Sequence, residues 1–276
     1  MLAIIKNTFR EALAKKIFIG YYIFYGIVVL VMLFAVNLDA VEGVMSFADV
    51  QKTIISVESG FVTLAFPLIL FFALISASSF ITSMVDKGTI DLLISKPVSR
   101  FKILTAKYIG STLFVAASIV FLIGSIWLIL SLKSGYWNAG FLFTIVSLTF
   151  AFAVMYSISI FIGLTTQSSI ISILVNFFLI FVFCPVLSAR EQLIFTFVKN
   201  DGVKFIFNFF YYILPKPGEI KDVTIALIAN ENVPLWKGVV NELGMMGPTW
   251  MSVFTSFLFC AVLYSYSVYY FAKKDY

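Results

Sequence analysis

The amino-acid sequence predicts an all-α integral membrane protein with six transmembrane helices. Of its 276 residues, 61% are hydrophobic and 12% are charged, whereas soluble domains carry roughly 25% charged residues. The mean hydropathy is +1.04. Several uncharged runs are long enough to cross a bilayer, which takes about 20 apolar residues in a helix. A soluble protein of this length would have to bury all of these runs, so we exclude that class.

Residues 1–16 are predicted to form an amphipathic helix at the membrane interface. The basic residues Lys6, Arg10 and Lys15 share one side of this helix, where they can meet anionic lipid. The opposite face is mostly apolar and contains Ile4, Ile5, Thr8, Phe9, Ala12 and Leu13. This pattern is typical of a helix that lies on a membrane rather than across it.

The first three spans follow from the uncharged runs. Residues 17–36 contain no charge, and as a helix they would extend about 30 Å, the thickness of one hydrocarbon core. Residues 37–60 are polar and acidic, which predicts an outer loop. Residues 61–84 form the second predicted span, with a kink expected at Pro67. The third span is predicted over residues 103–132.

The 56 positions from Ser134 to Ala189 contain no charged residue. One helix cannot use that length, so the stretch must hold two spans with a tight connection. The polar cluster Thr165–Ser169 is the expected turn. The fourth and fifth spans are therefore predicted over residues 139–164 and 169–187.

Residues 188–248 are predicted to form a long outer loop that precedes the last span. Within it, residues 203–214 are apolar but too short to cross a bilayer, which predicts an interfacial or re-entrant segment. The breaker cluster Gly244–Pro248 ends the loop. The sixth span is predicted over residues 249–272.

The distribution of Lys and Arg predicts that both termini are cytoplasmic. This orientation places eleven Lys/Arg in the inner segments and only two in the short outer ones, as the positive-inside rule requires. The long last loop holds six more, but the rule gives long loops little weight. The expected location is the cell membrane, with the net charge of +5 in contact with lipid headgroups rather than nucleic acid.

Several kinds of chemistry are excluded by the residue inventory. The chain has no His, so it offers no His-ligated metal site and no Ser–His or Cys–His nucleophile. None of its fifteen Gly is followed by Lys, so it has no P-loop for ATP. Cys184 and Cys260 both lie in apolar runs and are expected to remain unpaired. We therefore predict no catalytic residue, no metal site and no cofactor bound by this chain.

The most charged stretch of the protein lies between the second and third predicted spans. Thr89–Ile94 has the composition of a short amphipathic helix, which Pro97 would stop. Ser99 is a suitable N-cap for a helix that begins at Arg100. We expect a short helix at the cytoplasmic membrane surface. The alternative is a basic loop that only fixes the topology.

The run Gly88–Arg100, G-T-I-D-L-L-I-S-K-P-V-S-R, resembles a motif of the permease subunits of type-2 ABC transporters. The similarity continues into Lys107–Gly110, so it is specific over about twenty residues. The rest of the chain agrees in plan, and it looks closest to the branch that includes the permease of nitrous-oxide-reductase maturation. One departure is local: members often carry an acidic–basic–acidic run before the Gly, where this chain has only Val85-Asp86-Lys87.

The resemblance implies a function for this stretch. It would be the coupling helix, which docks into a separate ATPase subunit that binds ATP and Mg²⁺, while two permease chains form the translocation path. The interface expected from the resemblance has an apolar centre at Ile90, Leu93 and Ile94 and a polar rim at Asp86, Asp91, Lys96 and Arg100. The remaining expected interface residues are Gly88, Thr89, Pro97 and Ser99. Segment 203–215 resembles elements that close the outer mouth of such transporters.

Polar residues within the spans support two interpretations. Ser76 and Ser79 recur on one face of the second span, and Asn176 lies in the fifth. Such residues commonly form hydrogen bonds between packed helices. Alternatively, they line a substrate path between two permease chains, as a homodimer or a related pair.

Two other functions remain open from the sequence. A non-transporting membrane scaffold would show the same composition. An intramembrane enzyme would need facing carboxylates, His or an activated nucleophile at membrane depth, and the spans as predicted contain none. The substrate and the direction of transport do not follow from the residues, although the resemblance implies export.

Overall fold

The computed structural model describes residues 2–14, 16–35, 46–85, 88, 99–198, 200–230, 233 and 249–274. Most of these residues are helical, and none of them forms a strand. The elements are α1 (Leu2–Ala14), α2 (Lys16–Ala35), α3 (Phe47–Val85), α5 (Arg100–Ser134), the 3₁₀ turn η1 (Ala139–Leu142), α6 (Phe143–Thr166), α7 (Ser169–Phe178), the π-helical η2 (Leu179–Phe183), α8 (Cys184–Ser188), α9 (Arg190–Leu193), α10 (Asp201–Ile213), α11 (Pro217–Ile228) and α12 (Trp250–Lys273).

Five helical stretches among the described residues are long and apolar enough to cross a membrane. They are Phe47–Val85, Arg100–Ser134, Ala139–Thr166, Ser169–Ser188 and Trp250–Lys273, and they overlap the predicted second to sixth spans. α2 has nearly the bounds of the predicted first span, but its apolar stretch in this structure is the shorter Tyr22–Phe34. The protein is therefore a multi-pass helical membrane protein, and its first span, over α2, stays a prediction.

α3 begins earlier than the predicted second span. Ser46 caps it, because the Ser46 hydroxyl accepts the N–H of Asp49 at 3.3 Å and donates to the Asp49 carboxylate at 2.7 Å. This reciprocal capping satisfies a backbone N–H that a helix start leaves free. Residues 47–60, which were predicted to belong to an outer loop, therefore extend α3.

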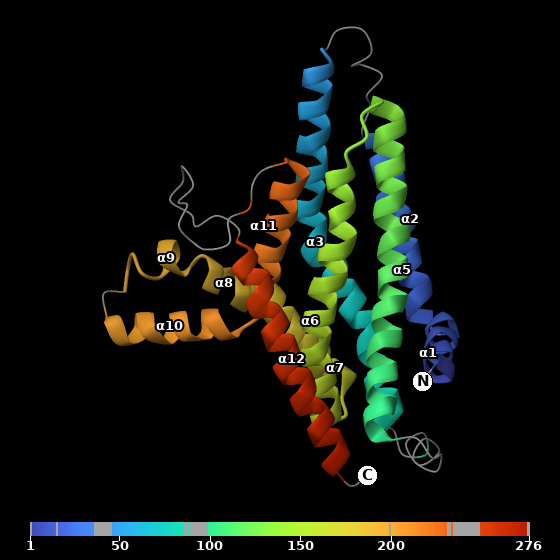
Figure 1. Ribbon diagram of the computed structural model, residues 1–276, viewed down its shortest axis with the longest axis vertical. Coiled ribbons are helices and arrows are strands. Elements are labelled where there is room, and N and C mark those ends of the chain that lie inside the picture. The colour runs from blue at the N-terminus through green and yellow to red at the C-terminus, as the bar shows by residue number, and fades with distance from the viewer. Residues whose placement is uncertain are drawn as a thin grey trace.

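The long helices form a bundle in which α2, α3, α5 and α6 run roughly side by side, and α12 crosses it obliquely (Figure 1). α6 lies at the centre and contacts α3, α5, α7, α11 and α12. Its Phe152 and Tyr156 are fully buried, with ring centroids 5.1 Å apart. α1 and the C-terminal end of α12 lie toward the same end of the bundle (Figure 1), as the topology prediction requires.

The predicted turn between the fourth and fifth spans is confirmed. Gln167 ends α6 in the left-handed region, with φ 54°. Ser168 then caps α7, because its hydroxyl accepts the N–H of Ile171 at 3.4 Å. The tight reversal lets α6 and α7 pack against each other.

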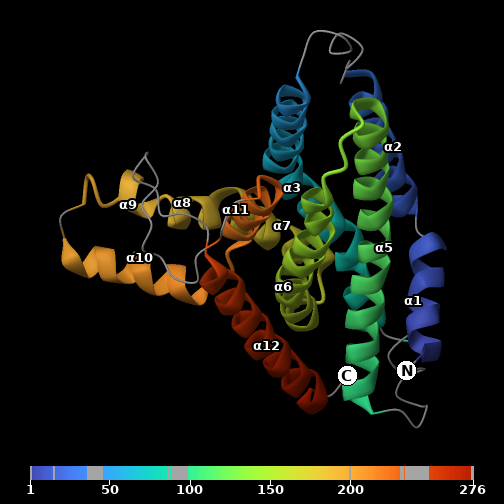
Figure 2. The ribbon, with the colours of Figure 1, turned by 45° about the horizontal axis from the view of Figure 1, so that its top comes forward.

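α8, α9 and α10 leave the bundle sideways, with α10 lying across the direction of the long helices (Figures 1 and 2). α10 covers most of the predicted segment 203–214, so its helical form agrees with the expected interfacial element. Only Tyr211 is buried, whereas Phe205, Phe209 and Tyr212 are exposed. The exposed apolar face suits contact with lipid, and its depth in the membrane stays a prediction.

Candidate functional site

The segment expected to couple to an ATPase is described only at its edges. Gly88 has φ 85°, a left-handed conformation that favours glycine. Ser99 is the N-cap of α5, as predicted, because its hydroxyl accepts the N–H of Lys102 at 3.4 Å. The other predicted interface residues lie outside the described part of the chain, namely Asp86, Thr89, Ile90, Asp91, Leu93, Ile94, Lys96 and Pro97. The coupling helix itself stays a prediction.

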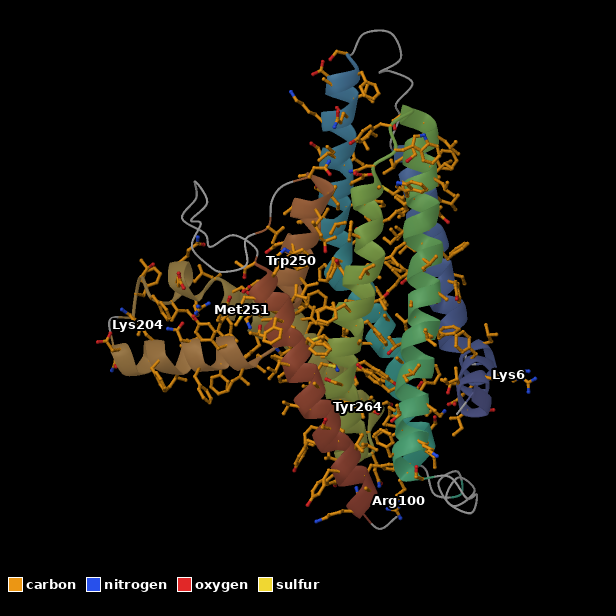
Figure 3. All side chains as sticks on the ribbon, in the orientation of Figure 1. Lys6, Arg100, Lys204, Trp250, Met251 and Tyr264 are labelled. Carbon is orange, nitrogen blue, oxygen red and sulfur yellow. The ribbon has the colours of Figure 1, made fainter. Side chains whose placement is uncertain are left out.

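Arg100 joins the start of α5 to the end of α12. Its guanidinium Nη1 donates to the carbonyl oxygens of Phe271, Ala272 and Lys274, at 3.3, 3.4 and 2.5 Å. A cation here satisfies the last carbonyls of α12 and complements the negative end of its dipole. Lys274 in turn donates to the carbonyl of Leu164 near the end of α6, at 3.1 Å. Figure 3 shows Arg100 at this end of the bundle.

A buried ion pair attaches α1 to the bundle near the same end. Lys107 of α5 is 2.5 Å from the carboxylate of Glu11, which also accepts the hydroxyl of Ser83 of α3 at 2.7 Å. The Lys107 side chain is only 6% exposed. The two helices approach closely, because a Cβ at Gly110 would lie 3.2 Å from Thr8. The amphipathic helix is therefore fixed to α5 by charge and by packing.

We expect Glu11→Gln to lower the free energy of unfolding by about 3 kcal/mol, because it removes the carboxylate charge beside the buried Lys107 ammonium. SDS titration of the purified chain in mixed micelles measures this loss. Lys6→Gln, on the exposed side of α1 (Figure 3), is the control and should change stability by less than about 0.5 kcal/mol. Equal stability of the two variants would show that the pair contributes nothing to the docking of α1.

The predicted pathway residues are all placed on packed helices. Ser76 is 1% exposed, and its hydroxyl donates within α3 to the carbonyl of Ala73 at 2.9 Å. Ser79 likewise donates to the carbonyl of Ser76 at 3.4 Å. Asn176 of α7 is buried and donates to the Ser159 hydroxyl of α6 at 2.8 Å. Asn176 thus makes an interhelical hydrogen bond within one chain, and a role in a path between two chains stays a prediction.

A buried polar cluster that the sequence analysis did not anticipate joins α10, α11 and α12. At its centre is Glu219 of α11, 8% exposed. Its two carboxylate oxygens accept hydrogen bonds from the hydroxyls of Tyr211, on α10, and Ser252, on α12. Ser252 also shares a hydrogen bond of 3.2 Å with Thr249. One carboxylate therefore holds three helices together.

Lys216 supplies the cationic side of this cluster. It is 5% exposed; its ammonium donates to the hydroxyl of Thr255 at 2.9 Å, and its backbone N–H donates to Ser256 at 3.1 Å. Desolvation lowers the pKa of Lys216 and raises the pKa of Glu219, while the attraction between the two charges opposes both shifts. The two residues therefore stabilise each other in their charged forms.

Arg190 extends the same cluster to α8 and α9. Its guanidinium carbon lies 3.5 Å from the centroid of the Tyr211 ring, a close cation–π contact. The side chain also donates to Asn208 at 2.7 Å and to the carbonyl of Leu187 at 3.0 Å. Its partner Glu191, at 3.2 Å, is on the exposed side. The helices that leave the bundle are thus held to α11 through Tyr211.

The longer α3 also buries an acidic residue. Glu58 is 1% exposed, and its carboxylate accepts the side-chain N–H of Asn138 at 2.6 Å. Asn138 also donates to the carbonyl of Ile228 at the end of α11, at 3.1 Å. The predicted second span began at Phe61 and so contained no acidic residue. Because α3 begins at Phe47, it includes the buried Glu58, which corrects that expectation.

The five apolar helical stretches and their packing define a multi-pass helical membrane protein. Arg100 joins its helices at one end, and a buried polar cluster joins α10, α11 and α12. Residues 2–276 match the family model described as ABC-2 family transporter protein, and the chain belongs to this family. No curated protein matches the chain. Membership makes it a membrane component of an ABC transporter, a class that normally works with a separate ATP-binding subunit and is not itself catalytic.

Proposed function

We propose that this chain is the permease subunit of an ATP-driven exporter, in which two permease chains form the translocation path and separate ATPase subunits bind ATP and Mg²⁺. One observation carries the proposal: a family match over residues 2–276 in a chain whose run Gly88–Arg100 has the coupling motif. The motif also supports the proposal that, within the family, this chain is most similar to the branch that includes the permease of nitrous-oxide-reductase maturation.

The proposed topology has six spans with both termini in the cytoplasm. Five of the spans are the long apolar stretches described above, and α2 is the first, with α1 lying at the inner surface. The common position of α1 and the end of α12 at one end of the bundle (Figure 1) supports this arrangement. α8 to α10 then belong to the outer half of the protein.

Arg100 has a mechanical role in this proposal. It is the last residue of the coupling motif, and its guanidinium donates hydrogen bonds to carbonyls at the end of α12. A displacement of the coupling segment by an ATPase would move the start of α5, and the Arg100 contacts would pass that displacement to the last span. Rigid helices joined at fixed points transmit such movements as rigid bodies.

The Arg100→Gln variant tests this role. We expect it to keep the ATPase bound, but to reduce permease-stimulated ATP hydrolysis about tenfold, since a hydrogen bond to a charged group contributes roughly 1.5–3 kcal/mol. Lys102→Gln, two residues on and exposed, is the control and should hydrolyse ATP as the unmodified complex does. If Arg100→Gln loses the ATPase while Lys102→Gln keeps it, Arg100 contacts the ATPase directly, as its expected place in the polar rim of the interface implies.

A further inference from the structure

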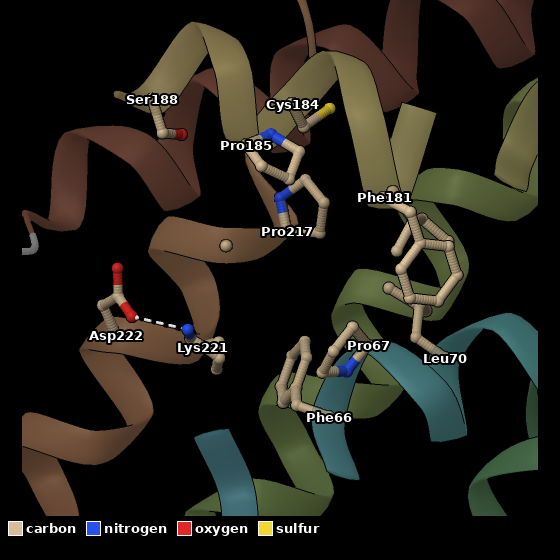
Figure 4. Close-up of a pocket in the computed structure, with 12 residues that line it drawn as sticks. Phe66, Pro67, Leu70, Phe181, Cys184, Pro185, Ser188, Pro217, Lys221 and Asp222 are labelled. Carbon is tan, nitrogen blue, oxygen red and sulfur yellow. Dashed lines mark ion pairs between the residues drawn. The ribbon is translucent and has the colours of Figure 1, made fainter. Parts of the chain in front are cut away.

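A cavity of about 280 Å³ lies between α3, α11 and the η2–α8 region (Figure 4). Three prolines line it: Pro67 within α3, Pro185 in the first turn of α8 and Pro217 at the start of α11. Pro67, within α3, removes one N–H that a regular helix would use, whereas Pro217 stands in the first turn of α11, where that N–H has no helical partner. Most of the remaining wall is apolar and includes Phe66 and Phe181. The cavity thus offers an apolar interior.

One side of the cavity is charged. Lys221 and Asp222 line it and form an ion pair of 3.2 Å, drawn as the dashed line in Figure 4. Their side chains are 22% and 49% exposed, so a second charged group can reach both. Opposite charges beside an apolar cavity are suited to a molecule that carries both charges and an apolar chain.

Gly218 also lines the cavity, and it keeps part of the space open. A Cβ placed there would meet no atom within 4 Å. Gly218 is not among the described residues with positive φ, so its backbone does not require glycine. A large side chain at this position therefore begins in open space at the wall of the cavity, with no backbone to collide with. This provides a way to fill the site while leaving its walls unchanged.

We propose that this cavity binds one alkyl chain of a zwitterionic phospholipid, with the phosphate at Lys221 and the cationic headgroup at Asp222. The volume of about 280 Å³ lies just below the roughly 300–1,000 Å³ of small-molecule sites, which suits a single alkyl chain. Asp222 would repel a headgroup that carries only negative charge. The site is formed within one chain, so it needs neither the ATPase nor a second permease and goes beyond the proposed function.

Native mass spectrometry of the purified chain, titrated with lysophosphatidylcholine, tests the proposal. Gly218→Phe should weaken binding about tenfold or more, because filling the cavity removes the burial of several methylenes. Gly124→Phe is the matched control: a Cβ there also meets no atom within 4 Å, and it lies in α5, away from the cavity. This variant should bind the lipid as the unmodified chain does.

The headgroup contacts are tested separately, so the result does not depend on the folding of Gly218→Phe. Lys221→Gln and Asp222→Asn should each weaken the binding of lysophosphatidylcholine about threefold or more. Neither substitution should change the binding of a neutral alkyl glucoside. Lysophosphatidylglycerol should bind the unmodified chain more weakly than lysophosphatidylcholine. Equal binding of the lipid to Gly218→Phe and Gly124→Phe would overturn the site, and equal affinity for the two lysolipids would overturn the zwitterionic assignment.

Discussion

Glu219→Gln is expected to lower the free energy of unfolding by about 3–5 kcal/mol, because the substitution keeps the side-chain volume but removes a buried negative charge. Lys216, also buried, then loses the carboxylate whose attraction favours its charged form. The hydroxyls of Tyr211 and Ser252 lose a charged acceptor as well, and hydrogen bonds to charged groups are about twice as strong as neutral ones. SDS titration in mixed micelles measures the change.

Two further variants assign the loss to the buried charge. Glu191→Gln removes a carboxylate that also contacts Arg190 but is 42% exposed, so it should cost less than about 1 kcal/mol. The double variant Glu219→Gln with Lys216→Met removes both buried charges and should recover much of the stability lost in the single variant. Similar losses in Glu219→Gln and Glu191→Gln would contradict the view that Glu219 holds α10, α11 and α12 together.

The helical plan could be predicted because it depends on local composition. A run of twenty apolar residues has to be a helix in a bilayer, whatever surrounds it, and the turn at Thr165–Ser169 is encoded by its own polar residues. Ser99 capped α5 as predicted for the same reason. The start of α3 was missed because residues 47–60 carry charges, and their helical form depends on the Ser46 cap and on the pairing of Glu58 with the distant Asn138.

The buried ionic cluster could not be predicted from local pattern. Its members are spread from Arg190 to Ser256, and the local sequence around each one is typical of a loop or a span. Only the tertiary fold brings them together. One signal was present: Lys216 stands between two prolines, three residues before Glu219, an unusual position for a solvated loop. Arg100 is a second example: its position at the end of the motif predicts an ATPase contact, whereas its hydrogen bonds to α12 depend on the tertiary fold and could not be predicted from the sequence.

The second large effect is expected at Ile90, in the predicted centre of the ATPase interface. Ile90→Asp should weaken binding of the ATPase subunit by more than about a hundredfold, because a carboxylate in a desolvated apolar contact leaves a charge unpaired. Phe197→Asp makes a similar change at an exposed apolar residue in the segment between α9 and α10, and it should leave binding unchanged.

The measurement that tests the central claim most directly is co-purification of this chain with a candidate ATPase subunit, together with the ATP hydrolysis of the complex. Our account predicts a stable, active complex for the unmodified chain and for Phe197→Asp, and its loss for Ile90→Asp while that variant remains inserted and folded. An unchanged complex with Ile90→Asp would contradict the coupling role of residues 88–100 and reduce them to a basic loop that fixes topology.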